Sequence, residues 1–159
     1  MQTIPLSRVD EITDEMFFIE DELKFEQMVD DLGARQPFVF TYLMTIGEGD
    51  FNDEEREMLL LLGVIVWRIM SSQEEIAPVS EDRLDQVEQL NMPLLEKLAG
   101  DESGFAASVE NMITAHNQPE VLRYVVESIV DDEEESGIRE INQGILIIFI
   151  KIVIDCLDG

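Results

Sequence analysis

Cysteine and histidine, on which many catalytic and metal sites depend, each occur only once in this sequence of 159 residues. A single thiol, Cys156, excludes an internal disulfide and a cysteine-based zinc cluster. Because Cys156 lies within an apolar run, we expect it to be buried and inert. The lack of a disulfide framework favours a reducing compartment, and we predict a cytoplasmic protein.

The single histidine, His116, also limits the chemistry. Helical di-iron proteins carry Glu-x-x-His pairs, but the residue three positions before His116 is Ile113. No serine lies in a G-x-S-x-G turn that would supply a triad through His116, and no glycine-rich phosphate-binding loop occurs. We therefore predict no enzyme: no catalytic, cofactor-binding or metal-binding residues, and no cofactor. His116 is expected instead at the C-terminal end of a helix.

Basic residues are scarce. The chain has ten lysines and arginines against 36 aspartates and glutamates, which gives a net charge of −26. Such a field repels nucleic acids and anionic membranes and favours basic partners or cations. We predict no direct nucleic-acid binding and no membrane binding, while a role of the acidity in solubility alone stays open.

Two acidic turns partly match the calcium-binding loop of EF-hands, which needs glycine at position 6 and a bidentate glutamate at position 12. The loop that starts at Asp132 has Gly137 at position 6, but Gln143 stands at position 12. The loop that starts at Asp50 lacks both the glycine and the final glutamate. We therefore interpret both segments as solvated turns.

Long hydrophobic runs are missing as well. The two most apolar stretches, 58–70 and 144–157, contain Arg68 and Lys151 respectively. Both are shorter than the roughly 20 residues that a membrane-spanning helix needs. The first ten residues also lack the basic and apolar regions of a signal peptide. We predict that both runs form buried helices of a protein that does not enter a membrane.

What the sequence does contain is enough apolar material to fold. Leu, Ile, Val and Phe make up about a third of the chain, above the roughly 20% below which chains are usually disordered. We predict a single all-helical domain over residues 1–159, with an irregular lead-in over 1–13. A first helix is expected from Asp14 to about Gly33, which suits a C-terminal cap.

Prolines then mark the starts of helices, because a proline in the first turn has no hydrogen bond to lose. Pro37 is expected to open a helix that ends at the turn 47–50, and Asn52 to cap a second helix that ends near residue 72. One amphipathic helix is expected over 80–90, and Pro93 opens or bends a shorter helix that ends at 100–104.

The remaining chain repeats this pattern. A helix is expected to run from the turn 100–104 to about residue 115, and Pro119 opens another that ends at the acidic run 131–135. The final helix is expected over 138–157. Its segment 145–154 is rich in β-branched residues and would suit a strand, but it has no convincing strand to pair with, so we favour a helix.

These helices predict an all-α protein of about seven helices, arranged as an antiparallel bundle or as a short α-solenoid of helical hairpins. The spacing of the prolines has no fixed period, so no named repeat family is supported. The two apolar helices are expected to lie centrally, or one of them in a subunit interface.

Lys151 stands alone among the isoleucines of the last helix. Burying an unpaired ammonium costs several kcal/mol, so its tip must reach either solvent or an acid, and Asp155 follows one helical turn later. We expect Lys151 to lie at an opening of the surface, with a buried ion pair as the alternative.

For function, the sequence favours a non-enzymatic interaction module that binds a basic or helical protein through a groove. One alternative is a nucleic-acid mimic, whose carboxylates would stand in rows and inhibit a basic protein. Another is an enzyme with a carboxylate-based site, which 36 acidic residues make hard to recognise. Homo-oligomer formation also stays open.

Overall fold

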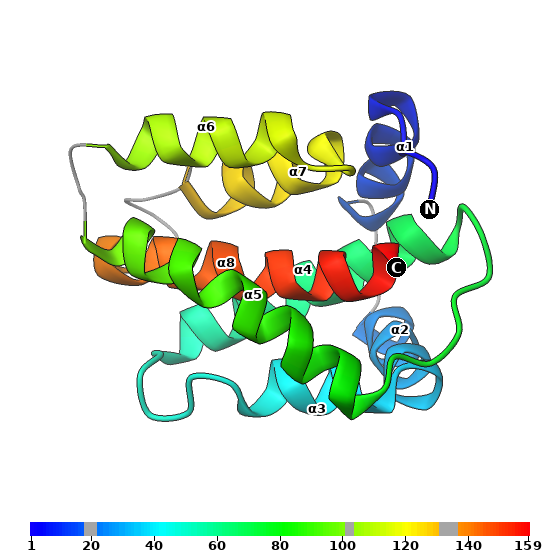
Figure 1. Ribbon diagram of the computed structural model, residues 1–159. Helices are drawn as coiled ribbons and strands as arrows, with labels where there is room; N and C mark the ends of the chain where they lie inside the picture. Colours follow the sequence, from blue (N-terminus) through cyan, green and yellow to red (C-terminus); the bar gives the residue numbers. More distant parts are fainter. Residues whose placement is uncertain (18–21, 101–103, 131–136) are drawn as a thin grey trace.

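The computed structural model describes residues 1–17, 22–100, 104–130 and 137–159, and in these ranges it contains eight α-helices and no strand (Figure 1). The helices are α1 (Leu6–Phe17), α2 (Glu22–Arg35), α3 (Pro37–Thr45), α4 (Asp53–Ser71), α5 (Glu81–Gly100), α6 (Phe105–Ala115), α7 (Pro119–Val130) and α8 (Glu140–Asp158). The predicted all-helical architecture is confirmed.

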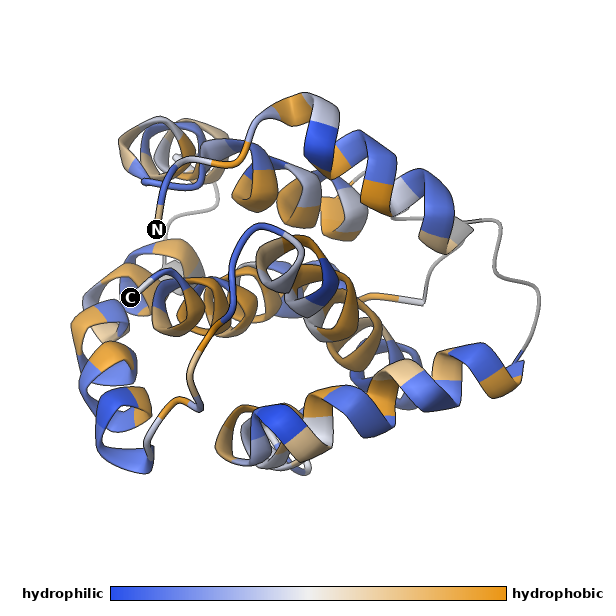
Figure 2. Ribbon diagram, turned by 90° about the vertical axis from the view of Figure 1, so that its right-hand side faces the viewer, coloured by the Kyte–Doolittle hydropathy of each residue, from blue (hydrophilic) through white to orange (hydrophobic). Residues whose placement is uncertain are grey.

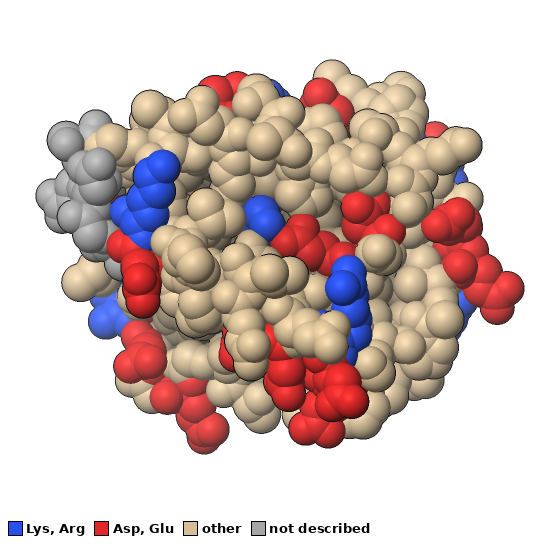
Figure 3. Space-filling view, viewed as in Figure 1, with Lys and Arg blue, Asp and Glu red and all other residues tan. Residues whose placement is uncertain are grey.

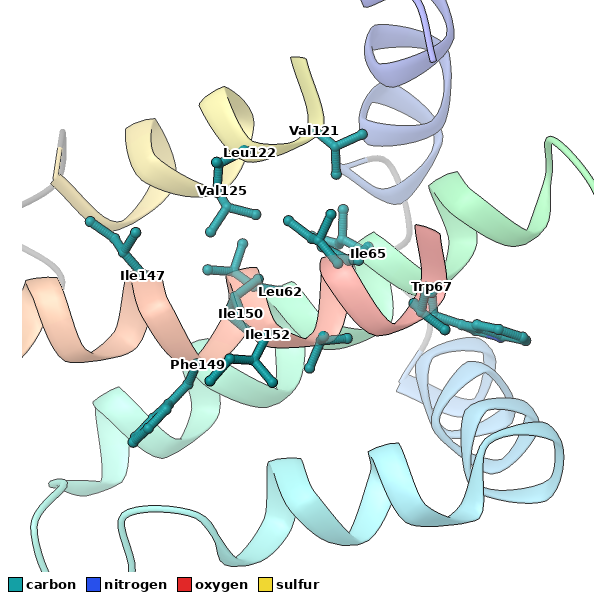
Figure 4. Packing of buried hydrophobic residues seen from close by; sticks show 14 of the residues in the cluster. Leu62, Ile65, Trp67, Val121, Leu122, Val125, Ile147, Phe149, Ile150 and Ile152 are labelled. Atoms are coloured by element: carbon teal, nitrogen blue, oxygen red, sulfur yellow. The ribbon is translucent and has the colours of Figure 1, made fainter. Parts of the chain in front are cut away.

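The two most apolar helices, α4 and α8, form the centre of the molecule. The β-branched segment 145–154 lies within α8, so it is a helix and not a strand, as predicted. Every residue from 146 to 154 is buried. Helix α8 packs against α4, α5 and α7. Figure 4 shows side chains of α4, α7 and α8 pointing toward one another, among them Leu62, Val125 and Ile150.

The contacts between helices identify a bundle. A solenoid confines contacts to neighbouring repeats, whereas here α1 contacts α7 and α4 contacts α8. The outer helices turn their hydrophobic positions toward the interior and their hydrophilic ones outward (Figure 2). The last helix of the chain is thus a core element that the earlier helices surround.

The start of α4 is fixed by local chemistry, as predicted. The Asn52 side chain accepts a hydrogen bond from the Glu55 N–H, and the Glu55 carboxylate accepts one from the Asn52 N–H, which together make a capping box. The preceding turn uses Gly47 and Gly49 at positive φ, a conformation that costs glycine little. Pro37 opens α3 and Pro119 opens α7, also as predicted.

The irregular lead-in predicted over 1–13 is wrong from Leu6 onward, because α1 begins there. Val9 and Ile12 are buried on its inner face and Met16 packs against the core one turn later. This spacing of three and four residues is an amphipathic helix pattern. The single helix expected from Asp14 to Gly33 is instead parts of two helices, α1 and α2, on either side of residues 18–21.

The separate helices expected over 80–90 and after Pro93 form one helix, α5, with Pro93 inside it. A proline within a helix removes one hydrogen bond, here to the carbonyl of Gln89. Pro93 and Gln89 are both exposed, so water can donate a hydrogen bond to the Gln89 carbonyl in place of the missing N–H. The acidic run 131–135 and the start of the calcium-like loop at Asp132 lie outside the described residues.

The acidic surface leads to a testable expectation about stability. Like charges repel more strongly in the compact state than in the unfolded chain, and salt screens them with a Debye length of about 8 Å at about 0.15 M. With a net charge of −26, the melting temperature is expected to rise between low and moderate NaCl concentrations. Calorimetry over this range measures the effect, and a flat or falling melting temperature would contradict it.

Candidate functional site

Two hollows lie between α5 and α6, with residues of α8 at the bottom of each, and we call the surface that runs from one to the other the trough. The first, of about 440 Å³, lies where Leu98 of α5 and Phe105 of α6 meet the first turns of α8, and we call it the Gln143 hollow. The second, of about 390 Å³, lies at the other end of α6, beside Ala115 and Lys151, and we call it the Lys151 hollow.

Residues of the same three helices line both hollows, so the hollows lie in line along α8. On α8, Gly144 lines the first hollow, and Lys151 and Asp155 line the second. Residues separated by seven and four positions lie on one face of a helix. Helix α6, which has 11 residues, separates the hollows by roughly 15 Å at about 1.5 Å per residue.

Lys151 forms the floor of the second hollow, and its side chain is only 11% exposed. Its ammonium donates to the Asn91 Oδ1 atom and to the Asp155 Oδ2 atom, both at 2.7 Å. Lys151 therefore lies at an opening of the surface, as expected, but its tip is paired with Asn91 and Asp155 and does not face solvent, so the alternative of a buried ion pair describes its contacts. The partner that decides this, Asn91, lies on α5, 60 residues away in the sequence.

Asp155 collects hydrogen bonds from three side chains. Besides Lys151, the Asn91 Nδ2 atom donates at 3.1 Å and the His116 Nε2 atom lies 2.5 Å from Oδ1. Burial by itself raises the pKa of this carboxyl, but the hydrogen bonds from His116, Lys151 and Asn91 and the positive charge of Lys151 outweigh it. The pKa of Asp155 is therefore held below its ordinary value, and the carboxylate stays charged.

His116 lies at the C-terminal cap of α6, as predicted, and both of its ring nitrogens are occupied. The Gln118 N–H donates to Nδ1 at 2.8 Å, so the ring proton lies on Nε2 and points to Asp155. A ring with neither nitrogen free is not arranged to take a proton from a substrate. Its visible role is to orient Asp155.

The two chain ends are joined by hydrogen bonds beside the second hollow, which Asp158 and Gly159 line. Asp158 accepts hydrogen bonds from the Asn117 and Gln118 side chains. The Gln118 side chain also donates to the Gln2 carbonyl, and the Met1 amino group donates to the Asp158 carbonyl at 3.1 Å. Figure 1 shows both ends of the chain on the same side of the molecule.

Each hollow has a largely exposed apolar side chain beside it. Ile141 at its edge is 79% exposed, and Leu90 at the other hollow is 75% exposed, the two highest values among the large hydrophobic residues that the structure describes. Gln143 is buried, and within the described ranges its Nε2 atom has no hydrogen-bond partner. An exposed apolar side chain at the edge of a hollow is available to contact a molecule bound in it.

A second buried charge lies behind the Gln143 hollow. Glu55 of α4 has no exposed surface and accepts hydrogen bonds from Asn52, Arg139 and Asn142. Burial raises the pKa of Glu55, but these hydrogen bonds together lower it below its ordinary value. This cluster joins the start of α4 to the start of α8 and so fixes one end of the trough.

The remaining chemical candidates are inert in the described part of the chain. Burial raises the pKa of the Cys156 thiol to about 12, so the reactive thiolate is not formed near neutral pH. Groups of three or more histidine, cysteine or acidic residues arranged to hold a metal ion do not occur among the described residues. Nor does any described helix have the length and hydropathy needed to cross a membrane.

Comparison with known proteins found no matching family model, no matching curated relative and no matching solved structure.

Sequence patterns missed most of this site. The Lys151–Asp155 spacing was visible, but Asp155 and His116 are 39 residues apart, and no local pattern joins them. The Glu55 cluster had a usable signal, because Asn52 and Glu55 stand at the spacing of a capping box. No sequence pattern indicated that Glu55 also bonds Arg139, which is 84 residues away.

Proposed function

We propose that this protein is a non-enzymatic interaction module whose trough between α5 and α6 binds a helical segment of a basic protein. The observation that carries the proposal is the pair of hollows in line along one face of α8, with the exposed Leu90 and Ile141 beside them. A helix in a groove is recognised by apolar residues on one of its faces.

The wall of the trough suits such a partner. On α5, Val87, Leu90 and Leu94 follow one another at helical spacing beside the Lys151 hollow. Leu98 continues this apolar stripe to the Gln143 hollow. An apolar face of a docked helix would therefore meet apolar side chains of α5 at both hollows.

The surrounding charge favours a basic partner. Figure 3 shows this face of the molecule, with separate groups of acidic residues along its edges and a small basic patch beside acidic atoms near its middle. The net charge of −26 would attract a basic partner and speed its association. On this face the acidic groups do not form one continuous row, which makes a nucleic-acid mimic the less favoured alternative.

Two further features support binding in place of catalysis. His116 has no free ring nitrogen, and the Cys156 thiol is buried with a raised pKa. We also propose a cytoplasmic setting, where a lone thiol stays reduced.

A synthetic amphipathic peptide of leucine and lysine provides the first test. A peptide of about 14 residues spans about 20 Å as a helix and so reaches both hollows. We expect it to bind saturably in calorimetric titration, and the double substitution Leu90→Gln/Ile141→Gln to weaken binding by about tenfold or more, because two apolar contacts are lost.

The substitution Leu6→Gln is the matched control, because Leu6 is a similarly exposed leucine on α1, away from the trough. A scrambled peptide of the same composition, which has no apolar face, separates groove binding from charge attraction. Equal binding of both peptides, or an equal effect of the control substitution, would reject the proposal and favour an acidic surface that acts by charge alone.

A further inference from the structure

In the Lys151 hollow the acidic side chains have a hydrogen-bond partner on every carboxylate oxygen, whereas the basic side chains still have donor hydrogens without a partner among the described residues. Asp155 and Asp158 accept hydrogen bonds on all of their carboxylate oxygens, from His116, Lys151, Asn91, Asn117 and Gln118. These acids therefore have donors already, and the hollow is not arranged to take a cation.

The two cations of the hollow have donors to spare. An ammonium has three hydrogens to donate, and Lys151 uses two of them, to Asn91 and Asp155. Arg83 lines the same hollow, and in the portion of the chain that the structure describes its guanidinium has no hydrogen-bond or ion-pair partner. A guanidinium is shaped to bind a carboxylate with two parallel hydrogen bonds.

Apolar side chains stand beside these donors. Val87, Leu90 and Leu94 line the same hollow from α5, and Leu90 is largely exposed to solvent. A ligand with an acceptor at one end and an apolar chain behind it would therefore meet a matching surface over its whole length.

We propose that the Lys151 hollow binds a carboxylate group carried on an apolar chain, with Arg83 and Lys151 as its donors. The carboxylate belongs either to a small carboxylic acid or to the C-terminal end of the helix in the trough. In the second case the inference rests on the proposed function, and it sets the direction of the bound helix, with its C-terminus at Lys151 and its N-terminus at the Gln143 hollow.

Hexanoate is the probe for the small-acid source. In a nuclear magnetic resonance titration of the intact chain, we expect saturable shifts of the backbone amides of Leu90, Ala115 and His116. The dissociation constant should be on the order of 1 mM, as for other ligands of this size. Hexylammonium has the same apolar chain with the opposite charge, and it is expected to leave these amides unshifted.

The substitution Arg83→Gln is expected to weaken hexanoate binding about tenfold, because it removes a charge-assisted pair of hydrogen bonds. Arg123→Gln is the matched control: it makes the same change of charge at a residue of α7 that bonds Glu110 and does not line the hollow. The proposal is overturned if hexanoate produces no saturable shifts, if hexylammonium shifts the same amides, or if the two substitutions act alike.

The leucine–lysine peptide separates the two sources of the carboxylate. If the hollow takes the end of a chain, the peptide with a free C-terminal carboxylate binds about tenfold more tightly than the peptide with a C-terminal amide. Equal binding of the two peptides beside clear hexanoate binding supports the small acid. Hexanoate binding without peptide binding would reject the proposed function and keep the carboxylate site. Peptide binding without hexanoate binding would reject the carboxylate site and keep the proposed function.

Discussion

Replacing Lys151 by methionine is expected to lower the free energy of unfolding by about 3 kcal/mol. Methionine has a similar length and suits the apolar surroundings, so the loss comes from the charge that stays behind. Asp155 would keep its hydrogen bonds from His116 and Asn91 but lose Lys151, which among the described residues is its one ion-pair partner of permanent charge. Removing one partner of a buried pair typically costs about 3–5 kcal/mol, and we take the lower end because Asp155 is partly exposed.

Denaturant unfolding measures this effect, and two further variants interpret it. Lys24→Met changes an exposed lysine of α2 and should alter stability by less than about 0.5 kcal/mol. The double variant Lys151→Met/Asp155→Asn removes the stranded charge, so it should be more stable than Lys151→Met alone. A loss below about 0.5 kcal/mol for Lys151→Met would mean that the lysine faces solvent after all.

The substitution Glu55→Gln is expected to cost about 2–3 kcal/mol, because one carboxylate serves the capping box, Arg139 and Asn142 together. The amide keeps the shape but has one acceptor oxygen and no charge. Glu54→Gln is the matched control in the same first turn of α4, where Glu54 is exposed. Equal stability of the two variants would show that the cluster adds nothing to the fold.

Acid titration adds a second measurement to this variant. The pKa of Glu55 is lowered in the folded state, so its contribution is present above the pKa of the unfolded chain and disappears as pH falls through the folded value. The contribution of Glu55 to the unfolding free energy should therefore be lost as pH falls below about 4. The difference in unfolding free energy between the wild-type protein and Glu55→Gln should therefore shrink as pH falls through this range.

Local patterns predicted the fold well where local chemistry decides it. Asn52, Pro37 and Pro119 begin helices because each acts within its own first turn, and the segment 145–154 is a helix although its residues favour strands. Patterns were wrong where a weak local signal competed with another. Pro93 suggested a helix boundary, but α5 continues past it because water can hydrogen-bond the carbonyl that loses its partner. The apolar face of α1 has few residues, and the segment was therefore predicted to be irregular.

The site itself was beyond local patterns. Whether Lys151 faces water or an acid depends on how α5 crosses α8, and that brings Asn91 to it across 60 residues. The trough likewise exists only because α5 and α6 both flank α8. For function the sequence favoured only a class, a module that binds a basic or helical protein, which stays a proposal. The residues that line the two hollows came from the structure.

The most direct test of the proposed function is the position of the bound helix. Intermolecular nuclear Overhauser effects appear only between groups in close contact. They can be measured between methyl groups of the protein and leucines of the leucine–lysine peptide. The account predicts such effects to Leu90 and Leu94 at one end of the trough and to Leu98 and Ile141 at the other. Effects confined to Leu6 or Leu61, or none at saturating peptide, would contradict it.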